Sequence, residues 1–302
     1  MAVFPPLLPP ADKRPPSQFW SSSETFLRDV FQLQTWVALG ALLQAALLLF
    51  LPLGWAVIPV GVYLASRIVN TLLIWGQLRP NPYMAGVLTQ KTSAQFPGST
   101  APGQQPLVVI QLAGRSNHAL GSAHPHFQKI VKYFEAMVHD LEADAANNRD
   151  DDDDYGYLGA KTFLANERLA SNEIMVLIYF RSYEGLHRFA HAAGGTHREA
   201  WTWWNTVLMG KGSTNGHLFS IMHEVYEMPA QHWESIYINY HPTSFGAASF
   251  REDVVDPVTG AKKTQWVRPL VDASRGRLST SKGRLATTQG EDNDKYESNP
   301  YT

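Results

Sequence analysis

The feature that most constrains this 302-residue chain is an almost unbroken apolar run from Leu33 to Trp75. The run is too long for one membrane span of about 20 residues. Pro52 interrupts it, which predicts two helices, near Leu33–Leu51 and Leu53–Trp75, joined by a tight turn. Basic side chains on both flanks favour a hairpin with both ends in the cytoplasm; they are Lys13, Arg14, Arg28, Arg79 and Lys91. We therefore predict a membrane anchor at residues 33–78.

Two other readings of the apolar run are weaker. A cleaved signal peptide fits poorly, because a long, Pro-rich and polar start precedes two apolar segments. A monotopic anchor is the main alternative to the hairpin, since the first segment is short and contains Gln44. With the anchor as the reference, the chain divides into a polar N-terminal segment (1–32), the anchor (33–78), a linker (79–105), an α+β domain (106–270) and a polar tail expected to be disordered (271–302).

Composition excludes several classes of function. The formal net charge of −2 offers no concentrated basic face, so we expect no nucleic-acid partner. The chain has no cysteine, which excludes disulfides, thiolate catalysis and Cys-ligated metals. The dinucleotide, P-loop and nucleophile-elbow motifs are also missing from the sequence, so neither nicotinamide nor flavin is indicated.

The domain reads as a split β-α-β arrangement. The order is strand, helix, two strands, two short helices, strand, and one further strand, which is the ferredoxin-like pattern of an antiparallel sheet with helices on one face. Ser182 and Thr196 are expected to cap the two short helices. The predicted strands are Leu107–Leu112, Tyr157–Leu164, Glu173–Arg181, His217–Met228 and Ser235–Tyr240, and the predicted helices are His126–Ala145, Tyr183–Ala193 and Thr196–Leu208.

Two further segments carry local signals. Five consecutive aspartates, Asp150–Asp154, lack the spaced ligands and Gly of a calcium loop, so a solvated loop is expected. Strands at Phe250–Val255 and Lys263–Val267 are expected to form a hairpin through a turn at Val258–Gly260. Because helices cover only one face of the predicted sheet, the other face needs a cover, and we expect a homodimer to supply it.

Histidines, tryptophans and tyrosines are concentrated between Ser182 and His241. Each of these side chains brings a polar atom that needs a partner when it is buried, so their concentration predicts a pocket with directed polar groups. His197, Trp201 and Trp204 recur at helical spacing and share one face. That face suits a flat ligand beside a His acid or base, and it is equally compatible with an ordinary core-facing stripe.

The other histidines give weaker signals. His187 and His191 are one helical turn apart, but they lack the His-Glu-x-x-His pattern of a zinc protease, so no metal site is predicted. In the strand His217–Met228, His223 should point to one face and Glu224 and Tyr226 to the other. A buried Glu224 would have a raised pKa and could act as an acid or base.

Tyr237 and Asn239 should share a face of the next strand. They are predicted to line the pocket together with the histidines. Cross-strand packing explains the same two residues equally well.

Taken together, several motifs resemble a fungal family. The chain resembles the ABM-type monooxygenase-like family of fumagillin biosynthesis. The motifs that carry the resemblance are Phe189-Ala-His191, His197-Arg-Glu-Ala-Trp201-x-Trp203-Trp204, His223-Glu-Val-Tyr226, Trp233-Glu-x-Ile-Tyr237-x-Asn239-x-His241-Pro242 and Pro269–Gly276. The likeness covers roughly Met84–Arg284.

The resemblance implies a dimeric α+β barrel and a role in fungal secondary metabolism. The substrate would be a lipophilic terpenoid or polyketide intermediate at the endoplasmic-reticulum membrane, with the domain facing the cytosol. Cofactor-free oxygenation would need a base and a dry pocket. In this interpretation the catalytic candidates are His197, His223 and Glu224, and the substrate-binding candidates are His191, Trp201, Trp204, Tyr226, Tyr237 and Asn239.

Two alternatives stay open at the level of sequence. The first is a haem enzyme on the same fold, with a histidine such as His191 or His223 as the iron ligand. The second is a non-redox protein. It would be a cyclase or isomerase using Glu224 as an acid, or a scaffold that presents an intermediate to a membrane-bound P450 partner.

Overall fold

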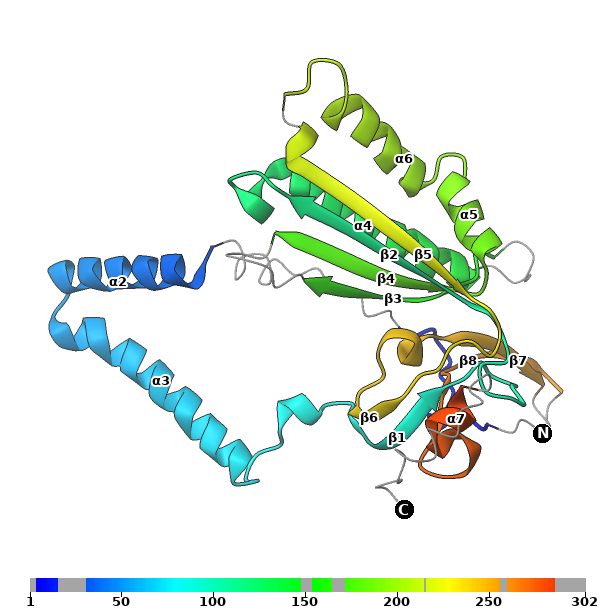
Figure 1. Cartoon of the computed structure of the whole chain (residues 1–302). Helices are drawn as coiled ribbons and strands as arrows, with labels where there is room; N and C mark the ends of the chain where they lie inside the picture. The colour runs from blue at the N-terminus through cyan, green and yellow to red at the C-terminus, as the bar shows by residue number, and fades with distance from the viewer. Residues whose placement is uncertain are drawn as a thin grey trace.

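In the computed structural model of the chain, antiparallel sheets and helices form an α+β body, and two apolar helices extend away from it (Figure 1). The expected α+β class is therefore confirmed. The structure describes residues 4–15, 31–147, 154–164, 172–214, 216–255 and 260–285. Most of the aspartate run and most of the predicted turn at Val258–Gly260 lie outside the described residues.

A four-stranded antiparallel sheet forms the upper half of the body. Its strands are β2 (Leu107–Ser116), β3 (Tyr157–Leu164), β4 (Glu173–Phe180) and β5 (Phe219–Met228), in the order β3-β4-β2-β5. The central strand β4 alternates between buried and half-buried residues, because one side of the sheet is packed and the other is partly open. This strand order is that of the split β-α-β pattern expected from the sequence.

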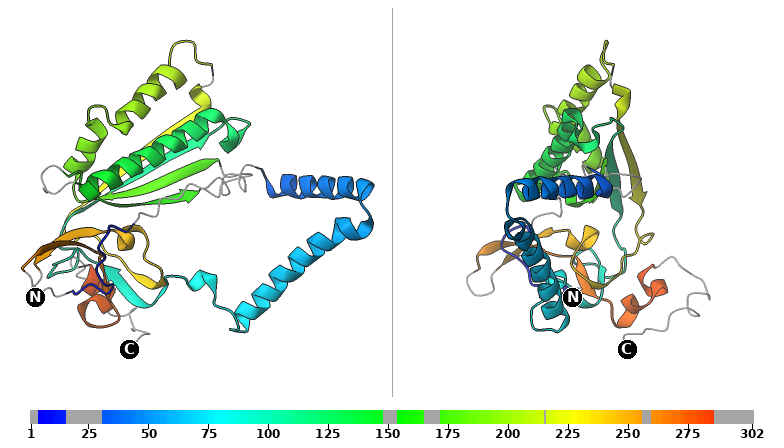
Figure 2. Two further views of the ribbon diagram at one scale, coloured as in Figure 1. Left: turned by 180° about the vertical axis from the view of Figure 1, so that it is seen from behind. Right: turned by 90° about the vertical axis from the view of Figure 1, so that its left-hand side faces the viewer.

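Helices pack on one face of this sheet (Figure 2). They are α4 (Pro125–Asn147), α5 (Tyr183–His191) and α6 (Thr196–Trp203). Ser182 caps α5 as predicted, since its Oγ accepts a hydrogen bond from the Gly185 N–H at 3.1 Å. The predicted cap of α6 is wrong by one residue: Gly195 occupies the N-cap position, and the Thr196 hydroxyl instead donates to Asp140 on α4.

The main core lies between α4 and the sheet. The apolar stripe of α4 is buried as predicted, and it packs on the inward residues of β2 and β4. Gly114 of β2 lies so close to α4 that an added Cβ would come within 2.9 Å of Ile130. Glycine is therefore needed there for the close approach of backbone and helix.

A second layer of strands packs against the first sheet. One of its strands lies within residues 79–105, which were expected to be a linker. Residues 79–105 contain β1 (Leu88–Ala94), which pairs with β6 (Tyr237–Tyr240) and β9 (Leu270–Asp272). The predicted hairpin is present as β7 (Phe250–Val255) and β8 (Lys262–Val267). Phe96, Trp233 and Phe245 fill the core between these strands and the first sheet.

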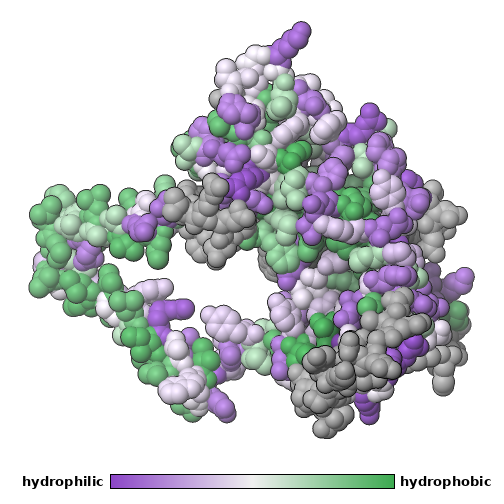
Figure 3. All heavy atoms as spheres, viewed as in Figure 1, coloured by the Kyte–Doolittle hydropathy of each residue, from purple (hydrophilic) through white to green (hydrophobic). Residues whose placement is uncertain are grey.

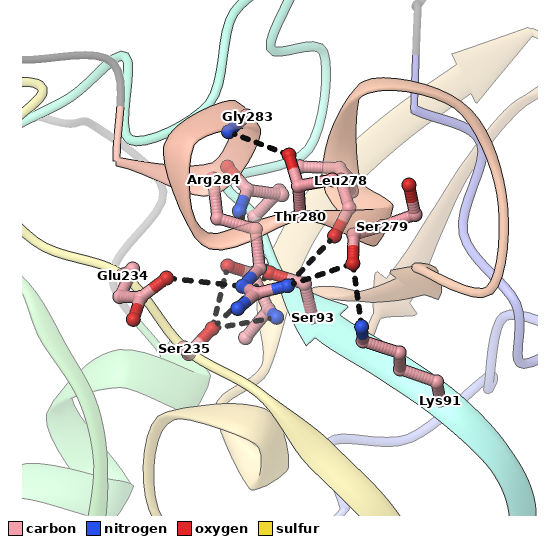
Figure 4. Close-up of polar contacts among 11 residues, drawn as sticks. Lys91, Ser93, Glu234, Ser235, Leu278, Ser279, Thr280, Gly283 and Arg284 are labelled. Atoms are coloured by element: carbon pink, nitrogen blue, oxygen red, sulfur yellow. Dashed lines mark hydrogen bonds and ion pairs between the residues drawn. The ribbon is translucent and has the colours of Figure 1, made fainter. Parts of the chain in front are cut away.

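The segment after Asp272 is partly ordered, which differs from the expected disordered tail. A 3-10 turn (Gly276–Ser279) and the short helix α7 (Ser281–Arg284) dock on β1 and the segment before β6 (Figure 4). The buried Arg284 guanidinium lies 3.0 Å from the Glu234 carboxylate and donates to the Leu278 and Ser279 carbonyls at 3.1 and 3.3 Å. A composition-based expectation misses such long-range polar contacts.

The N-terminal segment is also docked on the body. The Leu7 N–H donates to the Leu270 carbonyl at 2.8 Å, and Ala11 bridges to Trp266. The Arg14 guanidinium lies 4.9 and 5.4 Å from the ring centres of Tyr157 and Trp266, which is a cation–π arrangement. The described residues before the apolar helix pair, 4–15, therefore pack on the body that follows it in the chain.

The apolar run forms α2 (Leu33–Phe50) and α3 (Leu53–Trp75), with the break at Pro52 as predicted. Each helix is long and apolar enough to cross a membrane, and none of the most apolar window of either is buried against the protein. Figure 3 shows that apolar residues predominate on the surface of this pair. Gln44 uses its polar group inside the pair, donating to the Ala56 carbonyl at 3.1 Å.

Candidate functional site

An apolar groove runs between α4, α6 and the β2–β5 half of the sheet. Its cavity volume is about 60 Å³, and the groove is partly open to solvent. Its walls are almost entirely hydrocarbon and aromatic, so a lipophilic ligand would replace water there favourably. The lining residues are Leu112, Ile130, Tyr133, Phe134, Met137, His197, Ala200, Trp201, Trp203, Trp204 and Ile221.

His197 is the ionisable group best placed for chemistry in this groove. Its Nδ1 lies 2.8 Å from the Ala190 carbonyl oxygen. A carbonyl oxygen only accepts, so Nδ1 carries the proton and Nε2 keeps its lone pair in the neutral ring. Burial lowers the pKa of His197, the nearby His191 and His223 lower it further, and the Ala190 contact opposes them. The imidazole is therefore neutral at physiological pH, with Nε2 able to accept a proton.

The local helix geometry explains how the tryptophans reach the groove. His197, Trp201 and Trp204 share one face of α6 and its extension, and all three line the groove. A π-helical turn (Trp204–Leu208) continues α6, a feature that is frequent at functional sites. Trp201 is 56% exposed, so it lies at the rim of the groove.

The two candidates on β5 lie on opposite faces, as the alternation predicted. His223 pairs in register with Leu112 and lies on the helix side of the sheet, next to the groove. Glu224 and Tyr226 lie on the other side, where the Tyr226 hydroxyl donates to the Glu224 carboxylate. Both are exposed, so the condition of a buried Glu224 acid is not met. The structure separates this pair from the groove.

His191 lies on the outer surface of α5. Its ring stacks on that of His187 with centroids 4.0 Å apart, and its Nδ1 donates to the His187 carbonyl at 2.9 Å. It does not line the groove, although it is close enough to lower the pKa of His197. Its influence on the groove is thus electrostatic.

Tyr237 and Asn239 belong to the second layer and are remote from the groove. The Tyr237 hydroxyl accepts a hydrogen bond from the Gly246 N–H at 3.0 Å, and burial raises the pKa of this phenol. Asn239 is exposed and has a φ of 50°, which breaks the expected alternation along β6. The spacing of both residues was read correctly as strand, but the strand belongs to a different sheet.

Several groove residues come from α4 and were read from the sequence only as core. Tyr133 is the most informative, because its hydroxyl donates to the Glu199 carboxylate at 3.3 Å across the groove rim. Burial raises the pKa of Tyr133, and Glu199 raises it further. Tyr133 also packs against Trp203, with ring centres 5.6 Å apart. In the sequence, the Tyr133 hydroxyl beside the apolar stripe of α4 was the feature that could have indicated a role in the groove.

Within the described part of the chain, no group of three or more His, Asp or Glu side chains is arranged to hold a metal ion. His118, His124 and His126 do cluster around Phe219, with ring centres 4.3 and 5.1 Å apart. The Nδ1 atoms of His118 and His124 accept backbone N–H groups, so these rings serve as caps of local turns.

Comparisons with known proteins indicate the family of this chain. Residues 107–245 match the model of the family described as monooxygenase af470-like. The chain is 31% identical over 280 residues to monooxygenase af470 of Aspergillus fumigatus, and the alignment covers 91% of this chain and 94% of that protein.

Solved structures resemble the chain only distantly. A Bacteroides thetaiotaomicron protein of unknown function, described as a possible oxidoreductase, is 10% identical with a TM-score of 0.27, over 41% of this chain and 99% of that one. An aldoxime dehydratase crystallised with butyraldoxime is 15% identical with a TM-score of 0.35, over 52% and 42%. Likeness at this level supports no conclusion about chemistry.

Proposed function

This chain belongs to the monooxygenase af470-like family, and we propose that it is a membrane-anchored monooxygenase that oxygenates a lipophilic intermediate. The substrate class we propose is a terpenoid or polyketide of fungal secondary metabolism. The observation that carries the proposal is the neutral His197, with an Nε2 lone pair, in the wall of an aromatic groove.

The groove supports cofactor-free oxygenation, because it places a neutral histidine beside an apolar wall. His197 Nε2 takes a proton from an acidic carbon of the substrate, which leaves a carbanion stabilised as an enolate. The carbanion reduces dioxygen, a C–O bond forms, and the resulting hydroperoxide loses water to leave a carbonyl. One oxygen atom ends in the product and one in water, so a CH₂ group and O₂ give C=O and H₂O without an external reductant.

The apolar helices support a location for this chemistry. We propose that α2 and α3 insert in the endoplasmic-reticulum membrane with the body on the cytosolic side. Their exposed apolar surface would be unfavourable in water and favourable in lipid. A lipophilic intermediate partitions into the same bilayer, so the anchor raises its local concentration at the groove. A P450 in the same membrane is a reasonable partner for the product.

The partly open face of the four-stranded sheet supports a homodimer. Met222 and Tyr226 of β5 are 44% and 46% exposed on that face. A second copy of the sheet would cover them and form the barrel that the family resemblance implies. Sedimentation of the protein in detergent should then give a dimer mass, and a purely monomeric species would contradict this part of the proposal.

Oxygen consumption tests the proposed reaction. The protein in lipid nanodiscs is mixed with anthrone or with an apolar β-diketone whose central carbon is an unsubstituted CH₂, and O₂ uptake is recorded without nicotinamide or flavin. We expect uptake above the empty-nanodisc blank, with one atom of ¹⁸O₂ in the carbonyl product. The His197→Ala variant should lose about 10²- to 10⁴-fold in rate.

His232→Ala is the matched control, since His232 is exposed and its Nδ1 also contacts a nearby carbonyl, that of Ala230, at 2.9 Å. The control should keep the wild-type rate. Equal rates for wild type and the folded His197→Ala protein would refute His197 as the base. An absence of uptake with both probes would refute the proposed reaction on carbon acids.

Haem is the competing cofactor, because the same Nε2 lone pair is the donor that haem iron takes from histidine. The absorption spectrum of protein expressed with ample haem separates the two readings. A Soret band that disappears in His197→Ala would replace the cofactor-free proposal by a haem enzyme.

A further inference from the structure

Arg67 is a cationic side chain in the second half of α3, one of the two helices proposed to insert in the membrane. The sequence contains no Asp or Glu between Asp29 and Glu135, so the whole hairpin and its exit carry no acidic side chain. Within the described part of the chain, Arg67 forms no ion pair. The Arg67 guanidinium is therefore a charge on an otherwise uncharged helix, without an acidic side chain to pair with it.

The chain reverses at the end of α3 and brings a second guanidinium back to the same helix. Gln77 adopts a left-handed conformation with φ of 59°, and the Leu78 and Arg79 N–H groups both donate to the Leu73 carbonyl, at 2.8 and 3.1 Å. The reversal lets Arg79 donate a hydrogen bond to the side-chain oxygen of Asn70. Arg79 thus reaches back to Asn70, which lies more than one turn before the end of α3 at Trp75.

Arg67 and Asn70 are neighbours on the helix surface, three residues apart. Because Arg79 contacts Asn70, its guanidinium lies on the face of α3 that also carries Arg67. Two like charges on one helix face repel one another when the hairpin offers no acidic side chain to pair with them. An anion between or above them would remove that repulsion and take up their donors bidentately.

Exposed side chains at the end of α3 place Arg79 at the level of lipid headgroups. Trp75, Leu78 and Tyr83, which follow along the chain, are 82%, 79% and 86% exposed. Aromatic residues at the end of an apolar helix mark the membrane interface. Arg67 lies about 12 Å along the helix from Trp75, at about 1.5 Å per residue. Its long side chain can extend from there toward the headgroup phosphates.

We propose that Arg67 and Arg79 form a binding site for the phosphate of an anionic phospholipid in the leaflet next to the body. This proposal rests on the proposed insertion of α2 and α3 in the membrane. Asn70 acts as a positioning residue that holds Arg79 against the helix. The site fixes the depth and rotation of α3, and through the short connection to β1 it restricts how the body sits on the membrane.

Lipid binding to the full chain tests the site directly. The detergent-purified protein is titrated with phosphatidic acid or with phosphatidylcholine of the same acyl chains, and bound lipid is counted by native mass spectrometry. We expect a preference for phosphatidic acid that falls about fivefold for each guanidinium removed, in Arg67→Gln and Arg79→Gln and again in the double variant. Arg277→Gln, an exposed arginine far along the chain, is the matched control.

Two further measurements identify the ligand and distinguish a failure of the lipid site from a failure of the membrane anchor. Inorganic phosphate at millimolar concentration should not displace phosphatidic acid, and displacement would point to a soluble anion instead. Flotation with neutral phosphatidylcholine liposomes measures insertion by itself: wild type and the double variant should both float. Loss of flotation by wild type would refute the anchor. Flotation without any lipid preference, or a preference kept by the double variant, would refute the lipid site.

Discussion

The buried Arg284 network offers a test of how the C-terminal segment contributes to stability. The Arg284 side chain is only 4% exposed and pairs with Glu234, which is 33% exposed. The change Arg284→Met keeps most of the apolar stem but removes the charge and all its donors. We therefore expect a large loss of stability from a residue outside the sheets.

The size of the loss follows from the individual contacts. Breaking a buried ion pair costs about 3–5 kcal/mol when the remaining charge stays buried. Glu234 is partly exposed and can be hydrated, which reduces that term to about 2 kcal/mol. The Leu278 carbonyl loses its donor, at a further cost of about 1 kcal/mol. The Ser279 carbonyl keeps the donor from Lys91, so it adds little. The sum is about 3 kcal/mol.

Thermal unfolding of the detergent-purified protein measures this loss. For a domain of this size, about 3 kcal/mol corresponds to a fall of about 6–12 °C in the unfolding midpoint. Arg277→Met, at an exposed neighbouring arginine, should change the free energy of unfolding by less than about 0.5 kcal/mol.

In a double-mutant cycle, adding Glu234→Gln to Arg284→Met should cost less than it does in the wild type, because the pair is already broken. A midpoint for Arg284→Met within about 1 °C of wild type would refute the reasoning. Additive effects of the two substitutions would refute the assigned ion pair.

The other predictions concern packing, capping and protonation. Gly114→Ala should lower the free energy of unfolding by about 1–3 kcal/mol, because the new Cβ would lie 2.9 Å from Ile130, and a change below about 0.5 kcal/mol would contradict this contact. Ser182→Ala should cost about 1 kcal/mol in denaturant unfolding through the lost bond to Gly185 N–H, while an unchanged transition midpoint would argue against the cap. Burial holds the pKa of His197 below its ordinary value of 6.5 in the folded state, so the unfolded chain binds more protons, and stability should fall as the pH drops below 6.5. The fall should be smaller in His197→Gln, and identical pH profiles would show that His197 does not contribute to it.

Patterns that depend on near neighbours in the chain were readable from the sequence. The apolar run and its break at Pro52 define α2 and α3, and the stripe of α4 and the cap at Ser182 are also local signals. The alternation along β5 correctly separated His223 from Glu224. Periods of 3.6 and 2 fix which residues share a face, whatever the rest of the chain does.

The positions of the candidate site residues relative to one another depended on the tertiary structure. His197, Trp201 and Trp204 share one helix face, so the sequence grouped them correctly. Tyr237 has an equally regular spacing, yet its strand pairs with β1 in the second layer, because pairing partners are chosen by long-range contacts. The Tyr133 side of the groove was likewise hidden, since a stripe on α4 does not reveal which helix will pack beside it.

The sequence alone thus determined the helices and strands with clear periodicity, the apolar helix pair and the helix face that carries His197. The fold alone decided that residues 79–105 contain a strand, that the segment after Asp272 docks through Arg284, and that Glu224 lies across the sheet from the groove. The physical reason is that periodicity and capping act over a few residues. Pairing, burial of a charge and the closing of a groove depend on parts of the chain that meet only after folding.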